Sequence, residues 1–157
     1  MDPGDSPSGE GDRRSGGPLQ NAGVGADTRR MQTTSRPRVL IVDDAEDVRK
    51  LLGMMLESEG IDVVGEAADG AQGTELALEQ DIDCVIMDLR MPVMGGIEAT
   101  RRIKESKPDV HVFVFTAVDN PDEETLALAA GADEYLVKGT NALDLPARIL
   151  ASHANAA

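Results

Sequence analysis

The sequence is poor in aromatic, thiol and imidazole side chains: it has no tryptophan, one tyrosine, one cysteine and two histidines in 157 residues. The single cysteine, Cys84, cannot form a disulfide within the chain, and two histidines offer little for a zinc site. Apolar runs are only a few residues long, which predicts no transmembrane helix. The first residues also lack the apolar core of a secretory signal peptide. We therefore expect a soluble protein in the reducing cytoplasm.

Basic side chains are also scarce, because 15 lysines and arginines stand against 29 acidic residues and leave a net charge of −14. Residues 1–36 contain five acids and five arginines, so the negative charge lies in the remainder of the chain. Binding to nucleic acid or to an anionic membrane needs clustered lysine and arginine. We therefore expect neither as a direct partner, whereas cations should bind well.

Residues 1–36 are rich in glycine, serine and proline and contain few large apolar side chains. Such a segment cannot bury enough apolar surface to offset its loss of conformational entropy, so we predict a disordered amino-terminal extension. It could serve as a flexible tether or docking tail, or it could be an extension without a role, with translation beginning at Met31. A folded domain is expected over residues 37–153, followed by a short tail at 154–157.

From residue 38 onward, short apolar runs alternate with segments of helical periodicity. The run Val39–Val42 is typical of a strand buried on both faces, and the apolar residues from Val48 to Leu56 recur on one face of a helix that ends near Gly60. The other expected strands are 61–65, 82–87, 110–116 and 135–137, and the other expected helices are 69–80, 96–107, 122–130 and 141–152. The last helix starts at Asn141 or, because of Pro146, nearer Asp144.

Five strands alternating with five helices predict one α/β domain in which helices cover both faces of a parallel sheet. Polar side chains stand where four of these strands end. They are Asp43 and Asp44 after the first strand, Asp88 after the third, Thr116 at the end of the fourth and Lys138 after the fifth. Ligands of open α/β sheets bind outside the carboxyl ends of the strands. These side chains should therefore meet at one edge of the sheet.

Their chemistry suits phosphoryl transfer. Carboxylates at close quarters bind Mg²⁺, and an aspartate can itself accept a phosphoryl group. Thr116 can donate a hydrogen bond to a phosphoryl oxygen, and Lys138 can neutralise its charge. Taken singly, each residue has an ordinary role as a helix-terminal acid, a cap, a turn residue or a solvated charge. The prediction depends on their joint occurrence at strand ends.

Residues 38–152 resemble the receiver domain of bacterial two-component response regulators. The matching segments are Val39–Asp44, Val85–Pro92, Phe115–Ala117, Gly131-Ala132 and Tyr135–Lys138. The resemblance implies a flavodoxin-like (βα)5 three-layer sandwich whose five-stranded parallel sheet has the order 2-1-3-4-5.

The same resemblance implies a role for each residue at the edge. Asp88 would be the phosphoacceptor. Mg²⁺ would be held by Asp43, Asp44, Asp88 and the backbone carbonyl of Arg90. The phosphoryl oxygens would be contacted by Thr116, Lys138 and the backbone N–H groups of Leu89 and Ala117. The donor would be a phosphohistidine on a sensor histidine kinase or a histidine phosphotransfer protein. Such domains catalyse only their own phosphorylation and dephosphorylation, so no enzyme with a separate product is expected.

A switch is also implied. Thr116 would move towards the phosphoryl group, and Tyr135 would turn into the vacated space. This would remodel the face formed by the helix at 122–130, the strand at 135–137 and the helix at 141–152, through which the protein would contact an unknown downstream protein. A homodimer linked to phosphorylation is compatible with this scheme. Tyr135 could instead be an ordinary half-buried strand residue.

Three other functions compete with this interpretation. Only five residues follow Ser152, so we expect a stand-alone receiver, but the chain could be the receiver portion of a transcription factor without its DNA-binding domain. It could also be a pseudo-receiver that binds partners without phosphorylation, although no acid, threonine or lysine of the set is lost. A Mg²⁺-dependent phosphohydrolase is disfavoured, because Arg90 stands where such enzymes need a second acid.

Overall fold

A five-stranded parallel sheet lies at the centre of residues 35–156, the part of the chain that the computed structural model describes. The strand order is β2-β1-β3-β4-β5, which confirms the predicted order. The strands are β1 (Arg38–Val42), β2 (Asp62–Ala67), β3 (Cys84–Met87), β4 (His111–Thr116) and β5 (Glu134–Val137). The predicted disordered extension falls almost entirely on residues 1–34, outside the described residues.

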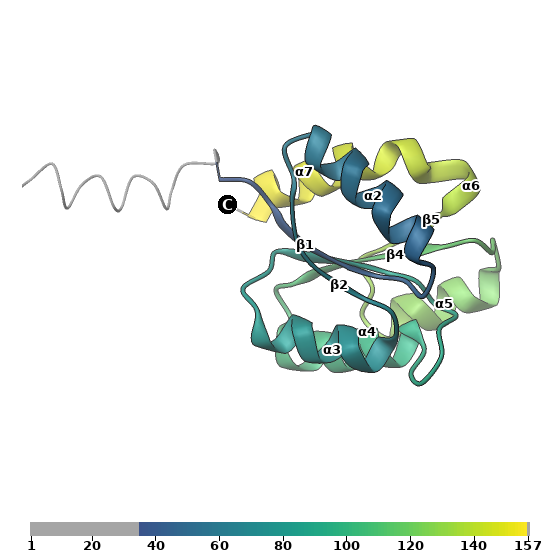
Figure 1. Ribbon diagram of the computed structural model, residues 1–157. Helices are drawn as coiled ribbons and strands as arrows, with labels where there is room; N and C mark the ends of the chain where they lie inside the picture. Colours follow the sequence, from purple (N-terminus) through teal and green to yellow (C-terminus); the bar gives the residue numbers. More distant parts are fainter. Residues whose placement is uncertain (1–34, 157) are drawn as a thin grey trace, which may run out of the picture. The chain divides into compact units, whose positions relative to one another are not determined.

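Helices cover both faces of the sheet and make three layers (Figure 1). α2 (Glu46–Ser58) and α7 (Leu145–Ala156) lie on one face, and α3 (Gly70–Glu79), α4 (Gly96–Ser106) and α5 (Pro121–Ala129) lie on the other. Within the described residues, every helix is too short or too polar to span a lipid bilayer. The flavodoxin-like three-layer architecture is therefore confirmed.

The packing of the core explains why the sequences of the central strands are unbroken apolar runs. Along β1, Val39 and Ile41 pack with α2 and α7, whereas Leu40 and Val42 pack with the helices of the opposite face. All four side chains are fully buried. A strand covered on both faces has no polar side to present, which accounts for the unbroken apolar run of β1.

Local signals set several helix ends. Gly60, with φ of 84°, ends α2 where the sequence predicted it. Asn120 caps α5 by accepting the N–H groups of Asp122 and Glu123, and Pro121 occupies the first helical position. Asp69 caps α3 in the same manner, through the N–H of Gln72.

The carboxyl-terminal segment differs from the single helix predicted at 141–152. A four-residue helix, α6 (Lys138–Asn141), comes first, a 3₁₀ turn η1 (Ala142–Asp144) follows, and α7 begins at Leu145. Pro146 is then the second residue of α7, where its missing N–H would have no helical acceptor. The alternative start near Asp144 is therefore the better prediction.

The same segment also differs at its end, because α7 continues to Ala156 rather than stopping at Ser152. Residues 154–156, which the sequence analysis assigned to a tail, are helical. Two of these three residues are alanine, the strongest helix former.

Candidate functional site

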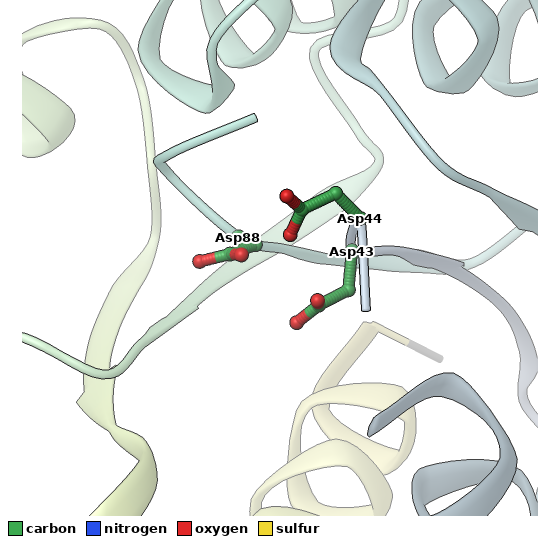
Figure 2. Close-up of side chains that lie close together, drawn as sticks. All are labelled: Asp43, Asp44 and Asp88. Atoms are coloured by element: carbon green, nitrogen blue, oxygen red, sulfur yellow. The ribbon is translucent and has the colours of Figure 1, made fainter. Parts of the chain in front are cut away.

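The carboxyl ends of β1 and β3 lie side by side in the middle of the sheet. Val42 and Met87 are paired in register, and the N–H of Asp88 donates to the carbonyl of Val42 at 2.9 Å. The residues that follow the two strands therefore stand together at one edge. Figure 2 shows Asp43, Asp44 and Asp88 gathered there.

The three aspartates form a tight acid cluster, in which one carboxylate oxygen from each lies within 4.8 Å of the others. Asp43 and Asp88 are buried, and Asp44 is exposed. Burial is the main cause that raises the pKa of Asp88, and the negative charge of Asp43 raises this pKa further. The ammonium of Lys138 and the N–H of Leu89 act in the opposite direction. A cation would relieve the repulsion between the carboxylates.

The donor set fits a hard divalent cation. All three ligand groups are carboxylates, and burial has already removed water from two of them, so a cation need not compete with their full hydration. Elsewhere in residues 35–156, no three acid, histidine or cysteine side chains come close enough together to hold an ion. The side chain of Arg90, whose carbonyl was the predicted further ligand, pairs with Glu123 at 2.6 Å rather than with the acids.

Lys138 reaches this edge from the opening of α6. Its Nζ lies 2.6 Å from Oδ2 of Asp43 and 3.7 Å from Oδ2 of Asp88. Both Lys138 and Asp43 are largely shielded from solvent, with side chains 21% and 4% exposed. The short charge-assisted hydrogen bond to Asp43 is therefore the dominant contact of Lys138, and Asp88 is its second neighbour.

Thr116 and Tyr135 are connected through a single residue, Val118, in the loop after β4. Thr116 is buried, and its Oγ1 accepts the Val118 N–H at 3.4 Å. The Tyr135 hydroxyl donates to the Val118 carbonyl at 2.9 Å. Partial burial is the main cause that raises the pKa of Tyr135. A movement of Thr116 would therefore reach Tyr135 through one residue of backbone.

The loop after Asp88 is held by two close backbone approaches. A Cβ atom at Gly96 would lie 1.9 Å from the Asp88 carbonyl oxygen, and one at Gly70 would lie 2.3 Å from the Met94 carbonyl oxygen. The N–H of Gly96 donates to the carbonyl of Leu89, and the N–H of Gly70 donates to the carbonyl of Met94. Only glycine fits at these two positions, and both contacts fix the loop that carries Asp88.

The tip of this loop contains a strained turn at Val93. Its φ is 68°, and the Met94 N–H donates to the Pro92 carbonyl at 2.7 Å. Together these define the rarer form of the γ-turn, in which the central residue has a positive φ. A β-branched residue is an outlier in this conformation.

Of the two predicted backbone donors, Leu89 directs its N–H at Oδ1 of Asp88, at 2.8 Å. Ala117 follows Thr116 directly and is exposed. Sequence reasoning missed Arg49, whose Nη1 donates to the Asp43 carbonyl at 2.8 Å. One signal could have revealed it, because Arg49 stands beside the apolar face of its helix, where a charged side chain needs a partner.

The chain is similar in sequence to known proteins. Residues 39–150 match the response regulator receiver domain. The chain is 40% identical over 116 residues to the transcriptional regulatory protein LiaR of Bacillus subtilis, an alignment that covers 73% of this chain and 55% of LiaR. It is 41% identical over 101 residues to the chemotaxis protein CheY of Halobacterium salinarum, with 64% of this chain and 83% of CheY covered.

Solved structures agree with the sequence comparison. The crystal structure of a LuxR-family two-component response regulator from Aurantimonas sp. SI85-9A1 has a TM-score of 0.72 and 35% identity, and the match covers 77% of this chain and 87% of that one. The chain spans about half the length of transcriptional relatives such as LiaR and the response regulator GacA of Pseudomonas aeruginosa. Receiver domains are signalling modules and not enzymes in the usual sense. The chain belongs to the response regulator receiver domain family.

Proposed function

We propose that the protein is a phosphoacceptor response regulator in which Asp88 takes a phosphoryl group from a phosphohistidine. An oxygen of the Asp88 carboxylate attacks phosphorus, the phosphorus–nitrogen bond breaks, and its electron pair leaves with the imidazole of the donor. The observation that carries this proposal is the position of Asp88 inside the three-acid cluster, with Lys138 Nζ 3.7 Å from one of its oxygens.

The groups around Asp88 have complementary tasks in this proposal. Asp43, Asp44, Asp88 and the carbonyl of Arg90 would hold Mg²⁺, which supplies charge neutralisation between the carboxylates and the phosphoryl group. Lys138, now bound to Asp43, would shift towards Asp88 and pair with a phosphoryl oxygen. Further donors would be the Thr116 hydroxyl and the N–H groups of Leu89 and Ala117. The same groups would serve the slow loss of the phosphoryl group, so the protein would act only on itself.

The signal would leave the site through Thr116 and Tyr135. A phosphoryl group adds a charge of about −1.5 to −2, and the Thr116 hydroxyl would turn to bind it. Val118 would then lose a contact of its N–H, and Tyr135 would exchange its bond to the Val118 carbonyl for a position nearer the core. The surface formed by α5, β5 and α7 would change as a result.

The proposed donor is a sensor histidine kinase or a histidine phosphotransfer protein in the cytoplasm, and the proposed recipient is a protein that recognises the altered surface. A second candidate function, the receiver portion of a transcription factor, is favoured by the likeness to transcriptional regulators such as LiaR. In either case this chain would transmit the signal by protein contact, including a homodimer formed on phosphorylation.

Intact-mass measurement after incubation with acetyl phosphate tests the proposal. We expect one added phosphoryl group in the presence of Mg²⁺ and none with EDTA or in Asp88→Asn. Asp109→Asn is the matched control, because Asp109 is an exposed aspartate in the loop before β4, at the opposite end of the sheet. An adduct that persists in Asp88→Asn would move the phosphoacceptor elsewhere. Absence of any adduct, together with no binding of beryllofluoride, would favour the pseudo-receiver.

A further inference from the structure

Arg49 connects the acid cluster to β2, the outermost strand on one side of the sheet. None of the roles predicted from the sequence involves Arg49. Its Nη1 donates to the carbonyl of Asp43 at 2.8 Å, and its Nε donates to Oε1 of Glu66 on β2 at 3.1 Å. The Arg49 side chain is only 16% exposed, against 44% for Glu66. A half-buried guanidinium held in two directions has one orientation, which makes it a rigid fork rather than a loose surface charge.

Arg49 binds the one polar group of Asp43, its carbonyl, that the other contacts of this residue leave over. The Asp43 N–H donates to Ala67 at 3.0 Å, Oδ1 accepts the Ala45 N–H at 2.9 Å, and Oδ2 accepts from Lys138 at 2.6 Å. The carbonyl is the remaining polar group, and it belongs to the peptide that links Asp43 to Asp44. Its orientation determines the direction in which Asp44 leaves the backbone, since the peptide is planar.

We infer that Arg49 is a positioning residue for cation binding, which holds the Asp43–Asp44 peptide so that both carboxylates face the same point. The inference rests on the proposed function, because it concerns the Mg²⁺ that Asp88 would need. Glu66 supports it by fixing the guanidinium and by balancing its charge, so that a positive side chain can lie against an acid cluster without neutralising it.

This positioning role can be distinguished from a purely electrostatic role, because the two predict opposite changes in cation affinity when Arg49 is removed. If Arg49 acted only as a nearby positive charge, its removal would make the cluster more negative and would tighten cation binding. If Arg49 orients the peptide, its removal loosens the ligands and weakens binding. Lysine at this position keeps the charge and cannot form the same two-way fork.

Calorimetric titration of Mg²⁺ into the full chain, without phosphoryl donor, makes the test. We expect Arg49→Lys and Arg49→Gln each to weaken Mg²⁺ binding about 10-fold or more, the effect typical of losing a partner that orients a metal ligand. Glu66→Gln keeps an acceptor oxygen and should show a smaller loss. Arg148→Gln is the matched control, since it removes an arginine that pairs with Glu134 at 2.8 Å, where β5 begins, and should leave binding unchanged.

Unfolding curves recorded in EDTA show whether each variant is folded before its affinity is compared. Wild-type affinity in Arg49→Lys together with tighter binding in Arg49→Gln would overturn the inference and leave the proposed function intact. Wild-type affinity in both variants would overturn it as well. If the wild-type chain binds no Mg²⁺, or if Asp44→Asn leaves binding unchanged, the proposed site itself is wrong and the inference falls with it.

Discussion

Replacing Val93 with asparagine should stabilise the protein, because Val93 occupies a backbone conformation that suits few side chains. A residue with a Cβ atom in such a sparsely populated backbone conformation costs about 1–3 kcal/mol, and branching at Cβ adds to the crowding. The Val93 side chain is 85% exposed. Full burial of a valine contributes roughly 2 kcal/mol, so its remaining contacts contribute only about 0.3 kcal/mol.

Three substitutions at Val93 separate strain from packing. Asparagine tolerates a positive φ better than a β-branched residue does, so Val93→Asn should raise the free energy of unfolding by about 1 kcal/mol. Val93→Gly relieves the same strain but increases the entropy of the unfolded chain, which leaves a gain of roughly 0.5 kcal/mol. Val93→Ala removes the branching but keeps a Cβ atom without a polar group, so it should raise the free energy of unfolding less than Val93→Asn does.

Urea unfolding followed by far-ultraviolet circular dichroism measures these differences, because the chain has no tryptophan to report unfolding. A gain of 1 kcal/mol corresponds to a rise of about 4 °C in the unfolding temperature of a domain of this size. Equal stability of Val93→Asn and Val93→Ala would refute the reasoning, since it would show that positive φ stores no strain at this turn.

Three further predictions concern the core and the acid cluster. Gly96→Ala should lower the free energy of unfolding by about 1–3 kcal/mol, because its Cβ would lie 1.9 Å from the Asp88 carbonyl oxygen. Gly53→Ala is the control, because a Cβ atom there would have nothing within 4 Å, and it should raise the free energy of unfolding by about 0.5–1 kcal/mol. Equal effects of the two substitutions in urea unfolding would argue against the close approach at Gly96. Asp88→Asn should stabilise the cation-free protein at neutral pH, because folding raises the pKa of Asp88 and so disfavours its ionised form. The gain should vanish below about pH 4, where both folded and unfolded chains are protonated, and a gain in thermal unfolding that does not depend on pH would contradict this cause. Cys84 should resist a thiol reagent in the native protein and react after unfolding in urea, because burial raises the pKa of its thiol; rapid native modification would show that its strand opens.

The position of the acid cluster could be predicted, because it depends only on which residue follows each strand in the sequence. Asp43 follows Val42 and Asp88 follows Met87 in the sequence, and parallel neighbouring strands bring such positions together. The partner of Lys138 could not be predicted in the same way. A long lysine side chain at this edge can reach either carboxylate, and only the three-dimensional structure shows that Asp43 is the nearer one.

Two other features depended on contacts that leave little trace in the sequence. Arg49 binds a backbone carbonyl, which every residue possesses, and a glutamate 17 positions away. The break between α6 and α7 reflects packing, because Leu145 and Ile149 are fully buried against the sheet and fix where α7 lies. Gly139, Thr140 and Asn141, which precede them in α6, are weak helix formers.

The position of Tyr135 has a consequence for optical spectroscopy. It is the only tyrosine in a chain without tryptophan, and its hydroxyl is bound to the Val118 carbonyl. The near-ultraviolet emission of the protein therefore comes almost entirely from one phenol ring, on the strand next to Thr116. A change in this emission when Asp88 is modified would report the surroundings of that ring alone, so the unaltered protein carries its own fluorescent label.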